Sequence, residues 1–218
     1  MTYTGQVSVG GPADVRELAD LTITKLAVGD MSNNAYLLEC RATGKRLLVD
    51  AAAEPKRLME LVGSTEALDG IVTTHRHPDH WAALDEVVKE TVARTFAGRD
   101  DADGIPVPTD VRLADGDTLR FGEVELEVVQ VVGHTPGSIV LVHRDSDGST
   151  HLFTGDSLFP GGPGRTTSPE EFDSIMRDLQ EKVFGRLPDE TWFYPGHGDD
   201  STLGAERASI PEWLARRW

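Results

Sequence analysis

The chain has 218 residues, of which 39% are hydrophobic and 27% are charged, the balance of an ordinary globular protein. Its formal net charge of -16 argues against a nucleic-acid partner, because an acidic surface repels a phosphate backbone. No apolar run approaches the roughly 20 residues that span a membrane, and no signal-peptide pattern opens the chain. The single cysteine, Cys40, cannot form an internal disulfide and is expected in a core or edge strand. The lone cysteine and the missing signal-peptide pattern favour the cytoplasm. The length fits one domain, residues 1–218.

The first half of the chain predicts an antiparallel β-meander, then a helix, a strand and a second helix. Alternating apolar and β-branched residues indicate strands over 21–28, 35–40, 46–50 and 70–73. Helical spacing over 54–62 places Leu58 and Leu61 on one face. A helix over 78–90 is expected next, because Trp81 and Leu84 share a face with the valines that follow them.

The second half predicts a further set of strands that begins a second sheet, and two more helices. Strands are expected over 111–113, 118–121, 124–132, 139–143, 151–154 and 192–194. Ser168 precedes a helix expected over 169–183, with Glu171 placed for a capping box, and a last helix is expected over 205–216 with a break near Pro211. The acidic residues 99–103 and the pair 199–200 are interpreted as solvent-exposed surface.

A histidine-rich stretch follows the strand predicted over 70–73. His75, His77, Asp79 and His80 place four possible metal ligands within six residues. The alternating His75 and His77 can face one ion, whereas Asp79 and His80, at the start of the next helix, can reach a second ion. A loop of solvated histidines is the alternative interpretation, and the tight spacing disfavours it.

Three later strands each end in a glycine followed by another possible ligand. These pairs are Gly133-His134, Gly155-Asp156 and Gly196-His197. Glycine lets the backbone turn sharply at the end of a strand, so that the next side chain can point into a shared cavity. One such pair is typical of a solvated turn, but three of them beside the histidine-rich stretch indicate a single site. The five histidines and two aspartates together suffice for two metal ions.

Four motifs, taken in chain order, resemble those of the metallo-β-lactamase superfamily, and the resemblance extends over about residues 21–197. They are His75-x-His77-x-Asp79-His80, Gly133-His134, Gly155-Asp156 and Gly196-His197. The resemblance implies an α+β fold, the αββα sandwich of two mixed β-sheets with helices on the outer faces. It implies that the first ion is held by His75, His77 and His134. It implies that the second is held by Asp79, His80 and His197, with Asp156 bridging both. Asp50 matches the first motif of the family, a carboxylate that supports the ligands from behind.

The resemblance implies a metal-dependent hydrolase that acts through a hydroxide bridging two divalent metal ions. Zinc is the expected metal, with iron and manganese as alternatives. Asp79 is the candidate catalytic residue, since its carboxylate can orient the hydroxide or accept a proton. The physiological metal, the number of ions and the oligomeric state are left open.

Residues 34–38 and 161–166 resemble glyoxalase II, a family that hydrolyses thioesters of a small thiol, so the expected substrate is a small-molecule thioester. Asp156 at the bridging position, where many β-lactamases have cysteine, disfavours antibiotic hydrolysis. The chain departs from glyoxalase II at Trp81 and Pro163, and it largely lacks the C-terminal extension that helps to bind glutathione, so the thiol and the acyl group stay open.

Two other functions are retained as alternatives. A persulfide dioxygenase-like enzyme would hold one iron through His75, His134 and Asp156, a facial triad with open positions. A non-catalytic binding module on the same fold is the third hypothesis, and the complete set of ligands disfavours it.

Overall fold

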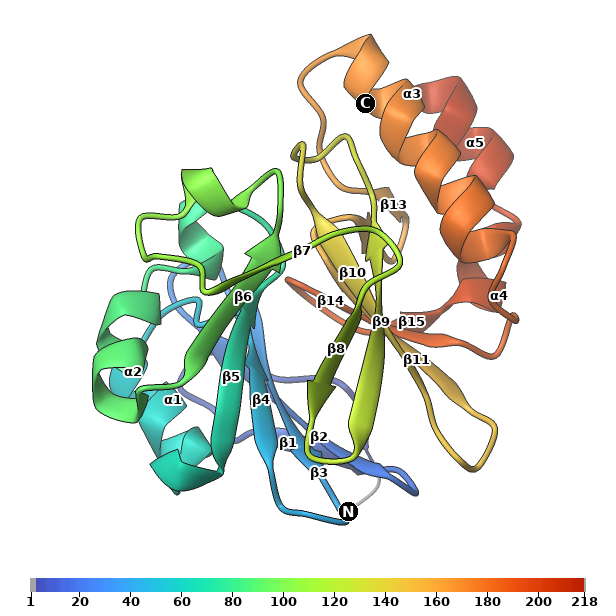
Figure 1. The fold of residues 1–218 in the computed structure, drawn as a ribbon. Helices are drawn as coiled ribbons and strands as arrows, with labels where there is room; N and C mark the ends of the chain where they lie inside the picture. The colour runs from blue at the N-terminus through green and yellow to red at the C-terminus, as the bar shows by residue number, and fades with distance from the viewer. Residues whose placement is uncertain (1–2, 218) are drawn as a thin grey trace.

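Two β-sheets pack face to face and helices cover their outer faces (Figure 1). The computed structural model describes residues 3–217. The larger sheet contains, in spatial order, β1 (Asp14–Glu17), β2 (Leu21–Val28), β3 (Asn33–Cys40), β4 (Arg46–Val49), β5 (Leu68–Thr73), β6 (Arg94–Gly98) and β7 (Val111–Leu113). Strands β4 to β7 run parallel and the others antiparallel, so this sheet is mixed.

The smaller sheet is also mixed. It contains, in spatial order, β15 (Ser201–Thr202), β14 (Trp192–Pro195), β11 (Thr150–Gly155), β10 (Ile139–Arg144), β9 (Val124–Gln130) and β8 (Thr118–Phe121). Only the pairing of β11 with β14 is parallel among its described strands. A separate ribbon joins β12 (Leu158–Phe159) to β13 (Gly162–Pro163). The expected αββα sandwich is confirmed.

The helices divide between the two outer faces. Those beside the larger sheet are α1 (Pro55–Val62) and α2 (Leu84–Thr91), and those beside the smaller sheet are α3 (Pro169–Asp178), α4 (Leu203–Arg207) and α5 (Ile210–Arg216). Ser168 and Glu171 form the capping box expected at the start of α3. Short 3-10 turns lie at Thr65–Ala67, Pro78–His80 and Ala102–Gly104, and a π-helical turn at Leu179–Phe184 continues α3. The described residues include no helix long and apolar enough to cross a membrane.

The central strands are apolar on both faces, because each face packs against a different layer. In β3, Tyr36 and Leu38 point into the core between the sheets, whereas Ala35 and Leu37 point toward α1 and α2. Cys40, at the end of β3, is 1% exposed and belongs to the core between the sheets, as expected. A third apolar cluster lies between the smaller sheet and the helices that cover it.

Several predicted elements differ from those observed. Strands β1 and β6 were not predicted, and β7 is not part of the second sheet but forms the edge of the first. The helix expected from residue 78 begins only at Leu84. Residues Pro78–His80 form a 3-10 turn instead, and the Trp81 indole that follows donates a hydrogen bond to the carbonyl oxygen of Arg76. The break in the C-terminal helix lies before Ile210, so that Pro211 occupies the first turn of α5.

The prediction that both acidic segments are surface is wrong at two positions. Asp101 is 0% exposed, although Asp100 and Asp103 lie at the surface as expected. The Asp200 side chain is 1% exposed and accepts hydrogen bonds from the buried Lys25 ammonium, at 2.7 Å, and from the Tyr3 hydroxyl. A buried carboxylate persists where donors satisfy its oxygens, and an acidic run in a sequence does not reveal those donors.

We expect Asp200→Ala to lower the free energy of unfolding by about 3–5 kcal/mol, because it leaves the buried ammonium of Lys25 without its carboxylate partner. The exposed neighbour offers a matched control, and Asp199→Ala is expected to change the free energy of unfolding by less than about 0.5 kcal/mol. Urea denaturation of the three proteins measures both values. Equal effects of the two substitutions would contradict a buried ion pair.

Candidate metal centre

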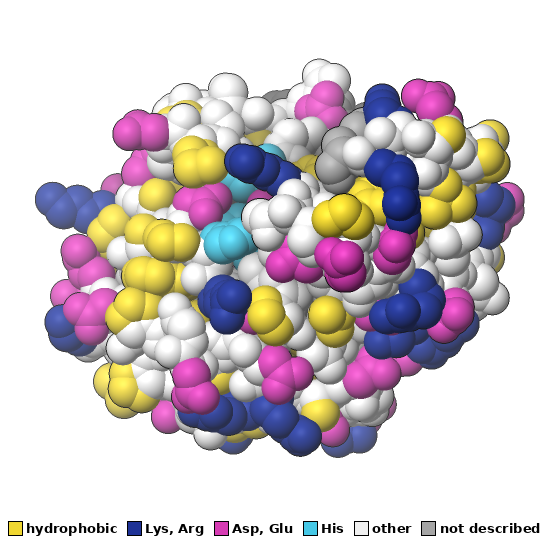
Figure 2. All heavy atoms as spheres, turned by 90° about the horizontal axis from the view of Figure 1, so that it is seen from above, with side chains coloured by type: hydrophobic (Ala, Val, Ile, Leu, Met, Phe, Trp, Pro, Cys, Tyr) yellow, Lys and Arg dark blue, Asp and Glu magenta, His cyan; other side chains and the backbone are white. Residues whose placement is uncertain are grey.

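All seven predicted ligands converge at one edge of the sandwich, the upper edge in Figure 1. The histidine-rich stretch follows β5, His134 follows β9, Asp156 follows β11 directly, and His197 follows β14. These strands belong to both sheets, so the site lies across the seam between them. Seen from above, imidazole surface is visible near the middle of this face with basic, acidic and apolar side chains around it (Figure 2).

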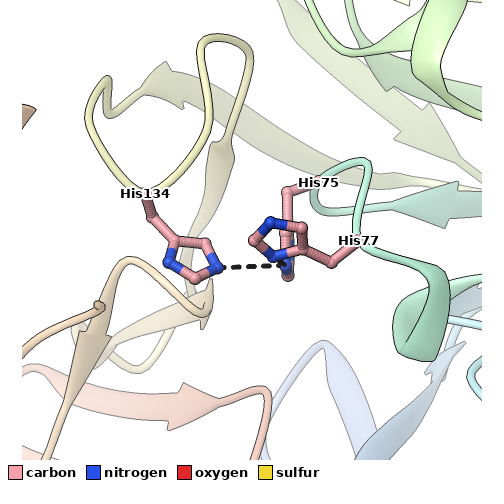
Figure 3. Close-up of side chains that lie close together, drawn as sticks. All are labelled: His75, His77 and His134. Atoms are coloured by element: carbon pink, nitrogen blue, oxygen red, sulfur yellow. Dashed lines mark hydrogen bonds between the residues drawn. The ribbon is translucent and has the colours of Figure 1, made fainter. Parts of the chain in front are cut away.

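The first group of ligands consists of three imidazoles (Figure 3). His75 Nε2 lies 3.0 Å from His77 Nδ1 and 3.3 Å from His134 Nε2. Ligand atoms about 2.0–2.1 Å from a tetrahedral zinc ion are separated from one another by about 3.3 Å. The three nitrogens therefore have the spacing of ligands around one cation.

The second group combines Asp79, His80 and His197. Asp79 Oδ2 lies 3.4 Å from His80 Nε2 and 3.3 Å from His197 Nε2. Asp156 lies between the two groups, since its Oδ2 is 3.7 Å from His134 Nε2 and 3.5 Å from His197 Nε2. One carboxylate therefore reaches both groups.

Two buried polar atoms in this cluster favour a bound cation. His80 Nε2 and Asp156 Oδ1 lie 3.3 Å apart, and neither has a hydrogen-bond partner within the described part of the chain. Leaving a buried polar atom unpaired costs about 1–3 kcal/mol. A divalent metal ion beside both atoms removes that cost, so the residues present fit the metal that the donor set implies.

Hydrogen bonds on the far side of three of the rings fix how these imidazoles face the site. His134 Nδ1 is placed to donate to the carbonyl oxygen of Arg165 at 2.8 Å, and His197 Nδ1 to that of Met31 at 3.0 Å. His80 Nδ1 lies 2.8 Å from Asp50 Oδ2. Because the outer nitrogen carries a proton in each case, Nε2 is the nitrogen that faces the site and that binds a metal ion when it is unprotonated.

Asp50 orients ligands of both groups. Its carboxylate is buried and accepts hydrogen bonds from the Thr74 backbone amide at 2.7 Å and from the Thr74 hydroxyl at 2.8 Å, as well as from His80. Since that hydroxyl donates to Asp50, it can only accept from His75 Nδ1, 3.1 Å away. Asp50 has a positive φ of 59°, a conformation that costs energy for a residue other than glycine and that is often found at functional sites.

The two groups differ in their electrostatics. Burial, together with the neighbouring imidazoles, lowers the pKa of His75 and of His77, which keeps both rings neutral. Burial also lowers the pKa of His80, but the carboxylates of Asp50 and Asp156 outweigh it and raise that pKa to about 10. The pKa of Asp156 is lowered despite its burial, because the imidazoles of His197 and His80 lie close to its carboxylate and stabilise its negative charge. His75 and His77 are thus already in the protonation state that metal binding requires.

The sequence patterns did not identify Asn33 as part of the site. The Asn33 side-chain amide is 2% exposed and donates to Asp79 Oδ2 at 2.9 Å, which orients that carboxylate. An asparagine between two strands is typical of a turn, and no local pattern marks Asn33 as a residue of the site. Tyr194 lies in the core between the sheets, where its hydroxyl is 2.8 Å from His151 Nδ1. Phe159 does approach the site, 6.3 Å from the ring of His197.

One further cluster of possible ligands lies at the other end of β10. It consists of Asp20, His143 and Asp145. The carboxylates of both aspartates already accept hydrogen bonds from backbone amides of the adjoining turns. These hydrogen bonds give the two carboxylates a structural role in stabilising the turns. A substitution in this cluster is therefore a suitable control for substitutions at the metal centre.

We expect His75→Ala to reduce the metal content per chain by at least half, because it removes the imidazole at the centre of the first group. His143→Ala removes an equally buried histidine from the other end of the molecule and is expected to leave the metal content unchanged. Elemental analysis of each protein, purified without chelator, measures this. Equal metal contents in both variants would show that the converging histidines do not hold the metal.

Comparison with known proteins identifies relatives by sequence and by structure. The family model of the metallo-beta-lactamase superfamily matches residues 28–197. A hydroxyacylglutathione hydrolase of Cereibacter sphaeroides is 35% identical over 165 residues, which cover 76% of this chain and 62% of that relative. The chain therefore spans less than two thirds of the length of this curated relative.

Solved structures agree with this relationship. The crystal structure of ETHE1 from Myxococcus xanthus superposes with a TM-score of 0.76 at 28% identity, covering 87% of this chain and 83% of that one. The crystal structure of TTHA1623 in a di-iron-bound form gives a TM-score of 0.70 at 28% identity, covering 86% and 98%. With a family match over most of its length and the same sandwich in its solved relatives, the chain belongs to the metallo-beta-lactamase superfamily.

Proposed function

We propose that the protein is a metal-dependent hydrolase that cleaves a small-molecule thioester with two divalent metal ions. The observation that carries the proposal is the position of Asp156, whose carboxylate lies 3.7 Å from a ligand of the first group and 3.5 Å from a ligand of the second. A carboxylate shared in this way suits a pair of cations. The hydroxyacylglutathione hydrolase among the relatives supports a thioester as the substrate.

Two divalent cations, when bound, lower the pKa of a water shared between them and polarise the substrate carbonyl. The side chains set the geometry in which this chemistry occurs. Asp79 is partly exposed and held by Asn33, so its carboxylate is available on the open side of the site to orient the attacking water and to receive its proton. Asp50, behind the ligands, keeps the rings of His75 and His80 in place.

A thioester suits this set of residues because of its leaving group. A thiol has a pKa of about 8.5, so a thiolate leaves near neutral pH without a strong general acid. His75 and His77 have a lowered pKa and do not supply such an acid. The proposal therefore needs only water activation and carbonyl polarisation from the site.

A mononuclear iron site on His75, His134 and Asp156 is the competing proposal, and it leaves half of the cluster unexplained. Asp79, His80 and His197 lie as close together as the first three imidazoles do. The buried Nε2 of His80 also has no hydrogen-bond partner in the described structure, and a single ion at the first group does not provide one. These observations favour two ions, and the di-iron form of TTHA1623 is consistent with them.

Stepwise metal addition tests the proposal. Chelation is expected to lower hydrolysis of a hydroxyacyl thioester of glutathione by at least about 100-fold, and zinc, iron or manganese is expected to restore it only as the second equivalent binds. Acyl-coenzyme A thioesters and matched oxygen esters, assayed in parallel, identify the thiol. Full activity at one equivalent of iron, with oxygen consumed in the presence of a persulfide, would replace the hydrolase with the dioxygenase.

The proposed role of Asp79 predicts a loss in turnover. We expect Asp79→Asn to lower kcat by about 100-fold, because the amide cannot accept the proton. Asp85→Asn on the exposed surface of α2, which loses only its ion pair with Lys89, is the matched control and is expected to keep wild-type kcat. Steady-state kinetics with saturating metal measures both. Wild-type kcat in Asp79→Asn would exclude this carboxylate from the reaction.

A further inference from the structure

Asp101 is a buried carboxylate that lies behind the metal centre and touches none of the proposed ligand side chains. It follows β6 within the acidic segment that sequence analysis assigned to the surface. A fully buried carboxylate is costly unless several donors satisfy it, so its hydrogen bonds reveal what it holds together.

The carboxylate joins the two loops that supply the first group of ligands. Asp101 Oδ2 accepts from the backbone amide of Arg76 at 3.0 Å, and Arg76 lies between His75 and His77. The same oxygen accepts from the hydroxyl of Thr135, the residue after His134. The remaining oxygen, Oδ1, accepts from the backbone amide of Gly137 at 2.9 Å, further along the second loop.

Glycines allow this arrangement by letting the backbones approach closely. A Cβ on Gly137 would lie 2.2 Å from the backbone nitrogen of Asp101. A Cβ on Gly98, at the end of β6, would lie 1.9 Å from the carbonyl oxygen of Gly137. Any larger residue at either position separates the segment that carries Asp101 from the loop that carries His134.

The first group depends on this contact more than the second group does. His134 is oriented by Arg165 and His75 by Thr74, but within residues 3–217 the His77 ring has no hydrogen bond to a residue outside the first group and packs edge-on against the rings of His75 and His134. The position of His77 is therefore set by its backbone, which Asp101 holds through the amide of Arg76. The second group relies on Asp50, Asn33 and the carbonyl oxygen of Met31 instead.

We propose that Asp101 is a positioning residue that sets the spacing of His75, His77 and His134, and thereby the affinity of the first group for its metal ion. The inference rests on the two-metal centre of the proposed function and is independent of the substrate. Residues behind metal ligands typically contribute 10–100-fold to metal affinity.

The test measures metal affinity at each group separately. His197→Ala disables the second group, and His77→Ala disables the first, so Asp101→Asn is combined with each and zinc affinity is measured by competition with a chromophoric chelator. We expect Asp101→Asn to weaken zinc binding by about 10–100-fold in the His197→Ala background and by less than about threefold in the His77→Ala background. This asymmetry is the signature of positioning, since a general loss of structure weakens both groups.

The same acidic segment provides the control. Asp103 is exposed and paired with Arg112, so Asp103→Asn removes the same charge at the surface and is expected to leave both affinities unchanged. If Asp101→Asn folds poorly, Thr135→Val removes one of the bonds and is expected to weaken only the first group, by about threefold. Equal losses at both groups, or no loss at the first, would overturn the positioning role. Failure of the unsubstituted protein to bind zinc would instead overturn the two-metal proposal, and this inference with it.

Discussion

The hydrogen bonds of Asp50 are the interaction on which the rest of the site depends. Through its direct bond to His80, and through the Thr74 hydroxyl to His75, one buried carboxylate orients a ligand in each group. The backbone around Asp50 adopts a left-handed conformation to place it there. That conformation persists because the amide and hydroxyl of Thr74 and the ring of His80 all bond to the carboxylate.

Buried acids recur behind the site, and each secures a different loop. Asp101 joins the loops of the first group, whereas Asp200 holds the buried ammonium of Lys25, which donates to the carbonyl oxygen of Gly198 beside His197. Part of the net charge of -16 is therefore structural rather than solvated. The hydrogen bonds of these acids restrict the motion of the loops that carry the ligands. The ligand atoms therefore lie at metal-binding distances before any ion binds.

The sandwich and the convergence of the ligands could be predicted from sequence, because both follow from local signals. Alternating strands and the Gly-His and Gly-Asp pairs each mark a strand end, and strand ends meet at one edge of a sheet. The strand at Arg94–Gly98 was missed because it is short and has little alternation. Asn33, Asp101 and Asp200 were missed for a different reason: their burial depends on partners distant in the chain, which no local pattern encodes.

The proposed reaction requires two metal ions with Asp156 between them, and anomalous diffraction from crystals of protein purified without chelator tests this requirement. We predict two peaks about 3.5–4 Å apart. One lies among His75, His77 and His134 and the other among Asp79, His80 and His197, with the Asp156 carboxylate between them. A single peak at the first group, with the Asp79 carboxylate and the His197 ring free of metal, would rule out the two-metal hydrolase.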